Sequence, residues 1–88
     1  MLPYRTEIRN SPIEQTLKIY LTDISLDEEL KNLLDTINGV RMVEVQESIS
    51  RNRAEENVTV FRKEDTSINI LKEKVDAFLA VYFERVNS

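Results

Sequence analysis

The sequence of 88 residues contains no cysteine, no histidine and a single glycine. Without cysteine the chain can form neither a disulfide nor a thiolate nucleophile, and without cysteine and histidine it lacks the usual ligands of a structural zinc site. The absence of histidine also removes the most common general base. No catalytic constellation is recognisable among the remaining residues. We therefore predict a protein that is not an enzyme and that holds no metal and no cofactor.

Long apolar segments are also missing from the chain. No run of residues is long enough to span a bilayer, and the first five residues lack the apolar core of a signal peptide. These absences favour a cytoplasmic protein without membrane contact. The net charge of −4 further disfavours indiscriminate binding of nucleic acid, which depends on an excess of lysine and arginine.

What is present is typical of one small globular domain, with 41% hydrophobic and 32% charged residues. Residues 15–88 are predicted to form this domain. Residues 1–14 contain both prolines, and we expect them to be an N-terminal arm. The alternation of Tyr4, Thr6 and Ile8 with polar residues also permits a short strand, although chain termini are usually loose.

Residues 16–45 have the pattern of a strand, a helix and a second strand. Leu17, Ile19 and Leu21 alternate with polar residues at the period of a strand. Leucine and isoleucine then recur at helical spacing, at Leu26, Leu30, Leu33, Leu34 and Ile37. Gly39 follows, where a left-handed residue can stop the helix. Val43 and Val45 resume the period of two.

The start of this first helix has the pattern of a capping box. Ser25 lies three residues before Glu28, so the serine hydroxyl and the glutamate carboxylate can each accept a hydrogen bond from the other's backbone N–H. We therefore expect the helix to begin immediately after Ser25.

The second half of the chain predicts a strand and a long helix. Residues 48–57 are polar and are typical of a hairpin loop, and the β-branched residues of 58–62 favour a third strand. Thr66 or Ser67 can cap a helix that continues to about Val86. The alternative is a helix that ends near Leu79, followed by a fourth strand over 81–86.

These elements predict an α+β fold of ferredoxin-like type, in the order βαββα, with an open antiparallel sheet and both helices on one face. The strands would lie in the order first, third, second. The outer edge of the first strand would then be unpaired, and an unpaired edge is a template for another strand. The N-terminal arm, a second copy of the chain or a partner protein are the three candidates.

The chain resembles a heavy-metal-associated domain, the module of copper chaperones. The resemblance rests on Ile-Asn-Gly-Val at 37–40 followed by Val43 and Val45, on the helix spacing of Leu30, Leu34 and Ile37, and on 58–61 before the second helix. It implies a ferredoxin-like fold. The family's metal-binding C-x-x-C pair aligns with Asp23 and Leu26, so the resemblance does not extend to metal transport.

Two groups of residues are candidates for a binding surface. Strand alternation places Tyr20, Met42 and Phe61 on the sheet face away from the helices, with Tyr20 and Phe61 expected side by side. Near the C-terminus, Tyr82, Phe83 and Val86 exceed what a small sheet is expected to cover. We expect Phe78 and Leu79 to belong to the core, and these three residues to form a dimer or partner contact.

The resulting functional hypothesis is a non-catalytic protein-binding or regulatory module. It would act as a homodimer or as the small, antitoxin-like partner of a larger protein. The alternatives are a metabolite-sensing domain and, less favoured, an RNA-binding domain that uses the sheet face.

Overall fold

A four-stranded sheet and two helices make up the part of the chain that the computed structural model describes, which is residues 3–22, 24–45 and 58–86 without the side chains of Ile24 and Val86. The expected hairpin loop from Ser48 to Asn57 lies outside these residues. The elements are β1 (Tyr4–Asn10), β2 (Gln15–Leu21), a 3-10 turn η1 (Ile24–Leu26), α1 (Asp27–Leu34), β3 (Val40–Val45), β4 (Val58–Arg62) and α2 (Ile68–Val86).

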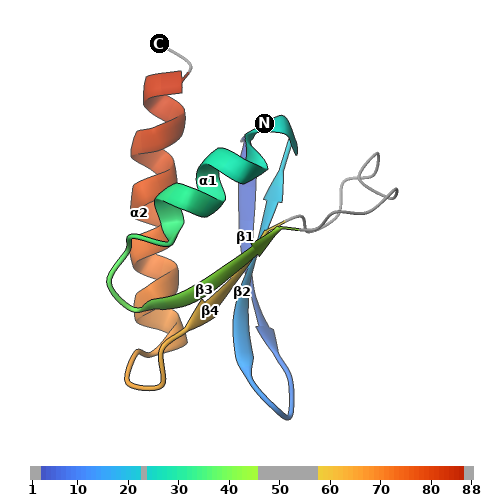
Figure 1. The fold of residues 1–88 in the computed structure, drawn as a ribbon, viewed down its shortest axis with the longest axis vertical. Coiled ribbons are helices and arrows are strands. Elements are labelled where there is room, and N and C mark those ends of the chain that lie inside the picture. The colour runs from blue at the N-terminus through green and yellow to red at the C-terminus, as the bar shows by residue number, and fades with distance from the viewer. Residues whose placement is uncertain (1–2, 23, 46–57, 87–88) are drawn as a thin grey trace.

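The strands form one open antiparallel sheet in the order β1-β2-β4-β3 (Figure 1). From β2 onward the elements follow the predicted βαββα order, and β2, β4 and β3 lie as expected for the first, third and second strands. The complete order is nevertheless ββαββα, which differs from the βαββαβ order of ferredoxin-like folds. The difference lies in the N-terminal strand.

The expectation of a loose N-terminal arm is wrong for residues 4–10, which form β1. They pair antiparallel with all seven residues of β2, from Tyr4 opposite Leu21 to Asn10 opposite Gln15. The hairpin turn is stabilised by Ser11, whose hydroxyl donates to the carbonyl of Glu14 at 2.9 Å and accepts from its N–H at 3.1 Å. The pairing satisfies backbone groups of β2 that would otherwise form an open edge.

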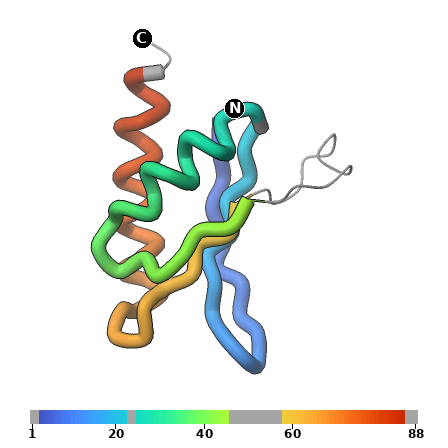
Figure 2. The backbone as a smooth tube through the Cα atoms, viewed as in Figure 1, coloured from blue at the N-terminus to red at the C-terminus, as the bar shows by residue number. Residues whose placement is uncertain are grey.

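The core lies between one sheet face and both helices. α1 contacts β3 and β4, and α2 contacts β1 and β2 (Figure 2). The sheet side of the core consists of side chains that are at most 5% exposed, namely Leu17, Ile19, Leu21, Val40, Val43, Val58 and Val60. The helices contribute Leu30, Leu34, Ile68, Leu71, Val75 and Leu79. The alternation read from the sequence therefore identified this inner face correctly.

The predicted capping box does not cap α1. The N-cap position is Leu26, which makes no side-chain cap hydrogen bond, and the helix begins at Asp27. The 3-10 turn over Ile24–Leu26 includes Ser25, so the helix starts after that turn. Three acidic residues still occupy the first turn of α1, where they interact favourably with the helix dipole.

Gly39 has the backbone conformation that its position predicts, with φ of +104°. It does not itself stop the helix, because α1 ends at Leu34 and a turn over 35–38 follows. A side chain at this position would also meet Thr66, whose Cγ2 lies 3.0 Å from where a Cβ would be. The positive φ therefore strains any other residue here, and a Cβ would in addition crowd the Thr66 side chain.

α2 is a continuous helix of 19 residues, so the alternative fourth strand over 81–86 is wrong. Of the two expected caps, Thr66 and Ser67, it is Ser67 that caps the helix: its hydroxyl accepts from the N–H of Asn69 at 3.2 Å, and its carbonyl accepts from the N–H of Leu71 at 2.9 Å. Within the described ranges, neither helix combines the length and apolar character needed to cross a membrane.

Candidate binding surface on the open sheet face

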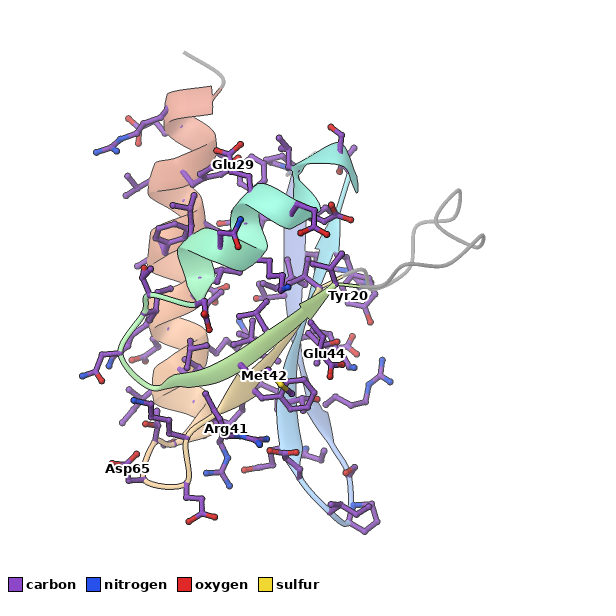
Figure 3. All side chains as sticks on the ribbon, in the orientation of Figure 1. Tyr20, Glu29, Arg41, Met42, Glu44 and Asp65 are labelled. Carbon is purple, nitrogen blue, oxygen red and sulfur yellow. The ribbon has the colours of Figure 1, made fainter. Side chains whose placement is uncertain are left out.

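The sheet face away from the helices, called the outer face below, carries side chains in three rows that cross the strands. Neither α1 nor α2 covers it, because both helices pack on the opposite face. The register between the strands defines each row. Figure 3 labels Tyr20 towards one end of this face and Met42 and Arg41 towards the other.

The middle row is polar and runs across all four strands. It consists of Glu7, Lys18, Thr59 and Glu44, each opposite the next. Lys18 Nζ donates to Thr59 Oγ1 at 3.0 Å. Glu7 and Lys18 are opposite charges at neighbouring positions on two strands, which is favourable. Because all four residues are polar, the row separates the two ends of the face.

One end of the face carries the apolar pair that the sequence predicted. Phe61 lies directly opposite Met42 on β3 and opposite Thr16 on β2. A β-bulge between Val40 and Met42 inserts Arg41 as an extra residue, and consecutive Arg41 and Met42 are both exposed. The bulge thus adds a charged side chain to the apolar pair.

Arg41 lies over this pair and links it to the hairpin turn. Its guanidinium carbon is 5.5 Å from the centroid of the Phe61 ring, within the range of a cation–π interaction. Its Nη2 also forms a salt bridge with the Glu14 carboxylate, in the turn between β1 and β2. Met42 remains 38% exposed beside it.

Tyr20 lies at the opposite end of the face, so the expectation that it would neighbour Phe61 is wrong. Phe61 pairs with Thr16, four residues before Tyr20, which corresponds to about 13 Å along a strand. Tyr20 is opposite Arg5 of β1, whose guanidinium lies 4.1 Å from the ring centroid. The predicted patch is therefore two separate aromatic sites, each covered by an arginine.

Sequence reasoning missed the basic residues that β1 brings to this face. Arg5 and Arg9 lie in residues that were expected to be a loose arm, and Arg41 reaches the face through the bulge. Among the described residues, four cations stand against three carboxylates here: Arg5, Arg9, Lys18 and Arg41 against Glu7, Glu14 and Glu44. The outer face is thus slightly basic although the chain has a net charge of −4.

The second candidate group, at the end of α2, is largely part of the core. Tyr82 and Phe83 are only 9% and 5% exposed, so they do not form the projecting contact that was expected. Phe83 stacks on Tyr4 of β1, with 5.3 Å between the ring centroids. The strand that the sequence did not predict firmly therefore covers this helix end. The side chain of Val86 lies outside the described residues.

Two edges of the sheet remain in the described part of the chain. β1 is one edge strand and β3 is the other, because β2 and β4 each have two neighbours. β3 is interrupted by its bulge, whereas β1 pairs with β2 over seven consecutive residues without a shift. The unpaired edge of β2 that the sequence predicted is filled by the N-terminal residues.

The described residues contain no group of three or more carboxylates that could hold a metal ion. Of the two positions that align with the metal-binding pair of heavy-metal-associated domains, Leu26 is the N-cap of α1 and Asp23 lies outside the described residues.

Comparison with known proteins yields no relative: no protein-family model matches the chain, and neither a curated protein nor a solved structure was found to be similar.

Proposed function

We propose that this chain is a non-catalytic protein-binding module, and that its outer sheet face is the binding surface. The observation that carries the proposal is that both helices leave this face uncovered while it holds Phe61, Met42 and Arg41 together at one end. Aromatic, methionine and arginine side chains are enriched in protein interfaces. The module would act by self-association or as the small, antitoxin-like subunit of a larger protein.

The fold is consistent with this proposal and with the heavy-metal-associated resemblance as a likeness of architecture. In this interpretation the domain is a ferredoxin-like variant in which β1 is added beside β2 as a new edge strand of the open sheet. We carry over no metal transport, because the chain has no cysteine to bind a soft metal ion.

RNA binding is the alternative that the outer face supports, since Arg5, Arg9, Lys18 and Arg41 all lie on it. Two observations favour protein over RNA. Both aromatic rings already have a guanidinium over them, and Arg41 is paired with Glu14 while Arg5 and Arg9 flank Glu7. Bases stack on open aromatic rings and phosphates need unpaired cations.

A pair of matched charge substitutions tests the proposal. Met42→Glu places a carboxylate at the apolar end of the outer face. Val81→Glu places one on α2, at a side chain that is 50% exposed. In affinity enrichment from the source cells with quantitative mass spectrometry, we expect Val81→Glu to retain the partner of the unmodified chain and Met42→Glu to lose it.

The same preparations decide between the alternatives. Retention of every enriched protein by Met42→Glu contradicts the assignment of the outer face. Enrichment of RNA instead, with affinity that falls steeply as salt rises, supports the RNA-binding alternative. A metabolite-sensing role would appear as a rise in melting temperature with a small molecule, by mass action.

A further inference from the structure

The outer edge of β1 exposes the backbone groups of every second residue. The N–H of Thr22 donates to the carbonyl of Pro3, and the N–H of Ser11 donates to the carbonyl of Glu14, both at 3.1 Å. These pairs flank the ladder between β1 and β2. Because hydrogen-bonded and non-hydrogen-bonded pairs alternate in an antiparallel ladder, the odd-numbered residues of β1 bond to β2. The open edge therefore belongs to Tyr4, Thr6, Ile8 and Asn10.

The side chains of β1 alternate in charge along the outer face. Glu7 lies between Arg5 and Arg9, at 3.8 Å and 3.9 Å from their guanidinium nitrogens. These side chains are 45–64% exposed, and such solvated ion pairs contribute little to the fold. On the inner face, Tyr4 and Ile8 are half-buried apolar residues that pack against the core. β1 thus has two apolar side chains, Tyr4 and Ile8, on either side of Thr6 on the inner face, and it alternates in charge on the outer face.

This pattern makes β1 complementary to its own copy in an antiparallel pair. With a two-fold axis at Thr6, Arg5 faces Glu7 of the second copy on both sides of the axis, and Tyr4 faces Ile8. These charged pairs are non-hydrogen-bonded pairs, in which side chains approach most closely. An axis at Glu7 would instead oppose glutamate to glutamate and Arg5 to Arg9, which is unfavourable. An axis at Ile8 would oppose Glu7 to Arg9 as favourably, but it would place Thr6 opposite Asn10 and leave Tyr4 without Ile8 as its neighbour, so the Thr6 axis is distinguished by its two apolar Tyr4–Ile8 pairs.

The same axis uses the exposed backbone groups. Thr6 would face Thr6 of the second copy, and Tyr4 would face Ile8 on both sides of the axis. Each of these pairs can exchange two hydrogen bonds, because the backbone N–H and C=O groups of all three residues point to the open edge. The opposite edge strand, β3, is less suited to such pairing, since its bulge between Val40 and Met42 disrupts the ladder.

We propose that the protein forms a homodimer in which β1 pairs antiparallel with β1 of a second copy, about a two-fold axis at Thr6. The two sheets become one continuous sheet. Because this axis is perpendicular to the sheet, both outer faces lie on the same side and the helices on the other. The inference rests on the proposed function in one respect: it specifies self-association and makes the binding surface bivalent.

The helix beside β1 is compatible with this arrangement. Thr6 Oγ1 donates to Asp76 Oδ1 of α2 at 2.6 Å, so the axis brings two copies of Asp76 towards each other. Each carboxylate already has its own counter-charge, because Lys72 Nζ lies 2.7 Å from Asp76 Oδ2. Ala80, one turn further along α2, is exposed and small.

Charge substitutions in β1 test both the edge and the register. The measurement is the solution mass of the full chain by sedimentation, over a range of concentrations. Glu7→Arg makes every charged pair repulsive and is expected to raise the dimer dissociation constant about tenfold or more. Arg5→Glu/Glu7→Arg restores opposite charges about the Thr6 axis and is expected to restore the dimer.

A second double variant is the matched control. Glu7→Arg/Arg9→Glu would restore opposite charges only about an axis at Ile8, so we expect it to remain as weak as Glu7→Arg. Both double variants place an arginine opposite Lys18 and share that effect on the fold. They differ at Tyr20, because Arg5→Glu removes the guanidinium over the ring and Arg9→Glu removes the donor to its hydroxyl, so circular dichroism and thermal unfolding are measured for each variant. A monomer at all concentrations, a dimer insensitive to Glu7→Arg, or rescue by the Arg9 variant instead would each overturn the proposal.

Amide hydrogen exchange supplies an independent readout. The N–H groups of Thr6 and Ile8 are expected to exchange several-fold more slowly in concentrated than in dilute protein, whereas those of Glu7 and Arg9, bonded within the monomer, change little. Equal behaviour of the two sets contradicts pairing at this edge. Met42→Glu leaves β1 intact, so the two proposals can fail separately. If Met42→Glu keeps its partner, the outer face is not the binding surface; if Met42→Glu loses its partner but the unmodified chain is a monomer, only the dimer proposal fails.

Discussion

The two faces of this sheet differ in how their side chains are held. On the inner face, Leu17, Ile19 and Val60 are fully buried under two helices. On the outer face, side chains pair with one another across the strands, as Lys18 does with Thr59 and Arg5 with Tyr20. The inner face therefore contributes the buried apolar area of the fold, whereas neither helix packs on the outer face.

The sharpest test of this difference uses two consecutive residues of β2. Leu17→Ala removes a fully buried side chain and leaves a cavity, so we expect a loss of about 2–5 kcal/mol in the free energy of unfolding. Lys18→Ala, on the outer face, should change it by no more than about 0.5 kcal/mol. Urea unfolding followed by circular dichroism measures both. Similar losses for the two variants would show that the outer face is also packed.

Gly39 tests the connection between the helix layer and the sheet. Gly39→Ala introduces a Cβ at φ of +104° and against Thr66, and we expect it to cost about 1–3 kcal/mol. In the background of Thr66→Ala the contact is relieved but the backbone strain stays. In a double-mutant cycle, Gly39→Ala should therefore cost less in the Thr66→Ala background than in the unmodified chain. If it costs nothing in that background, the positive φ contributes nothing to the loss.

The two half-buried tyrosines of the first hairpin lie on opposite faces and offer a matched comparison. Tyr4→Ala removes the stack on Phe83 and uncovers the end of α2, with an expected loss of about 2 kcal/mol. Tyr20→Ala removes a ring beneath Arg5 and a hydroxyl that accepts an exposed hydrogen bond from Arg9 Nη2 at 3.5 Å, and it should cost about half as much or less. Thermal unfolding compares them, and a larger loss for Tyr20→Ala would contradict the assignment of the faces.

The smallest expected effects concern two threonines. Thr6→Val on the inner face removes the hydrogen bond to Asp76, and we expect a loss of about 1 kcal/mol because that carboxylate is partly exposed. Thr59→Val on the outer face removes a hydrogen bond from Lys18 but leaves a solvated ammonium group, so its effect should be close to zero. Urea midpoints at low protein concentration, where sedimentation shows no self-association, provide the comparison.

The sequence by itself determined the features that depend on neighbouring residues. The alternation of Leu17, Ile19 and Leu21 identified the inner face, and Ser67 with the apolar stripe after it identified α2, because both periods are written in consecutive residues. Gly39 was recognisable because a lone glycine between a helix and a strand has few other uses.

Only the tertiary structure decided which distant segments meet. β1 was ambiguous because a strand of seven residues gains its stability from pairing with β2, which local sequence does not reveal. Once β1 is paired, Tyr4 covers Phe83, so the expected C-terminal contact becomes core. The register places Tyr20 away from Phe61, and the bulge brings Arg41 over that ring. Register and bulges arise from contacts between strands, so the composition of the outer face could not be read from any single strand.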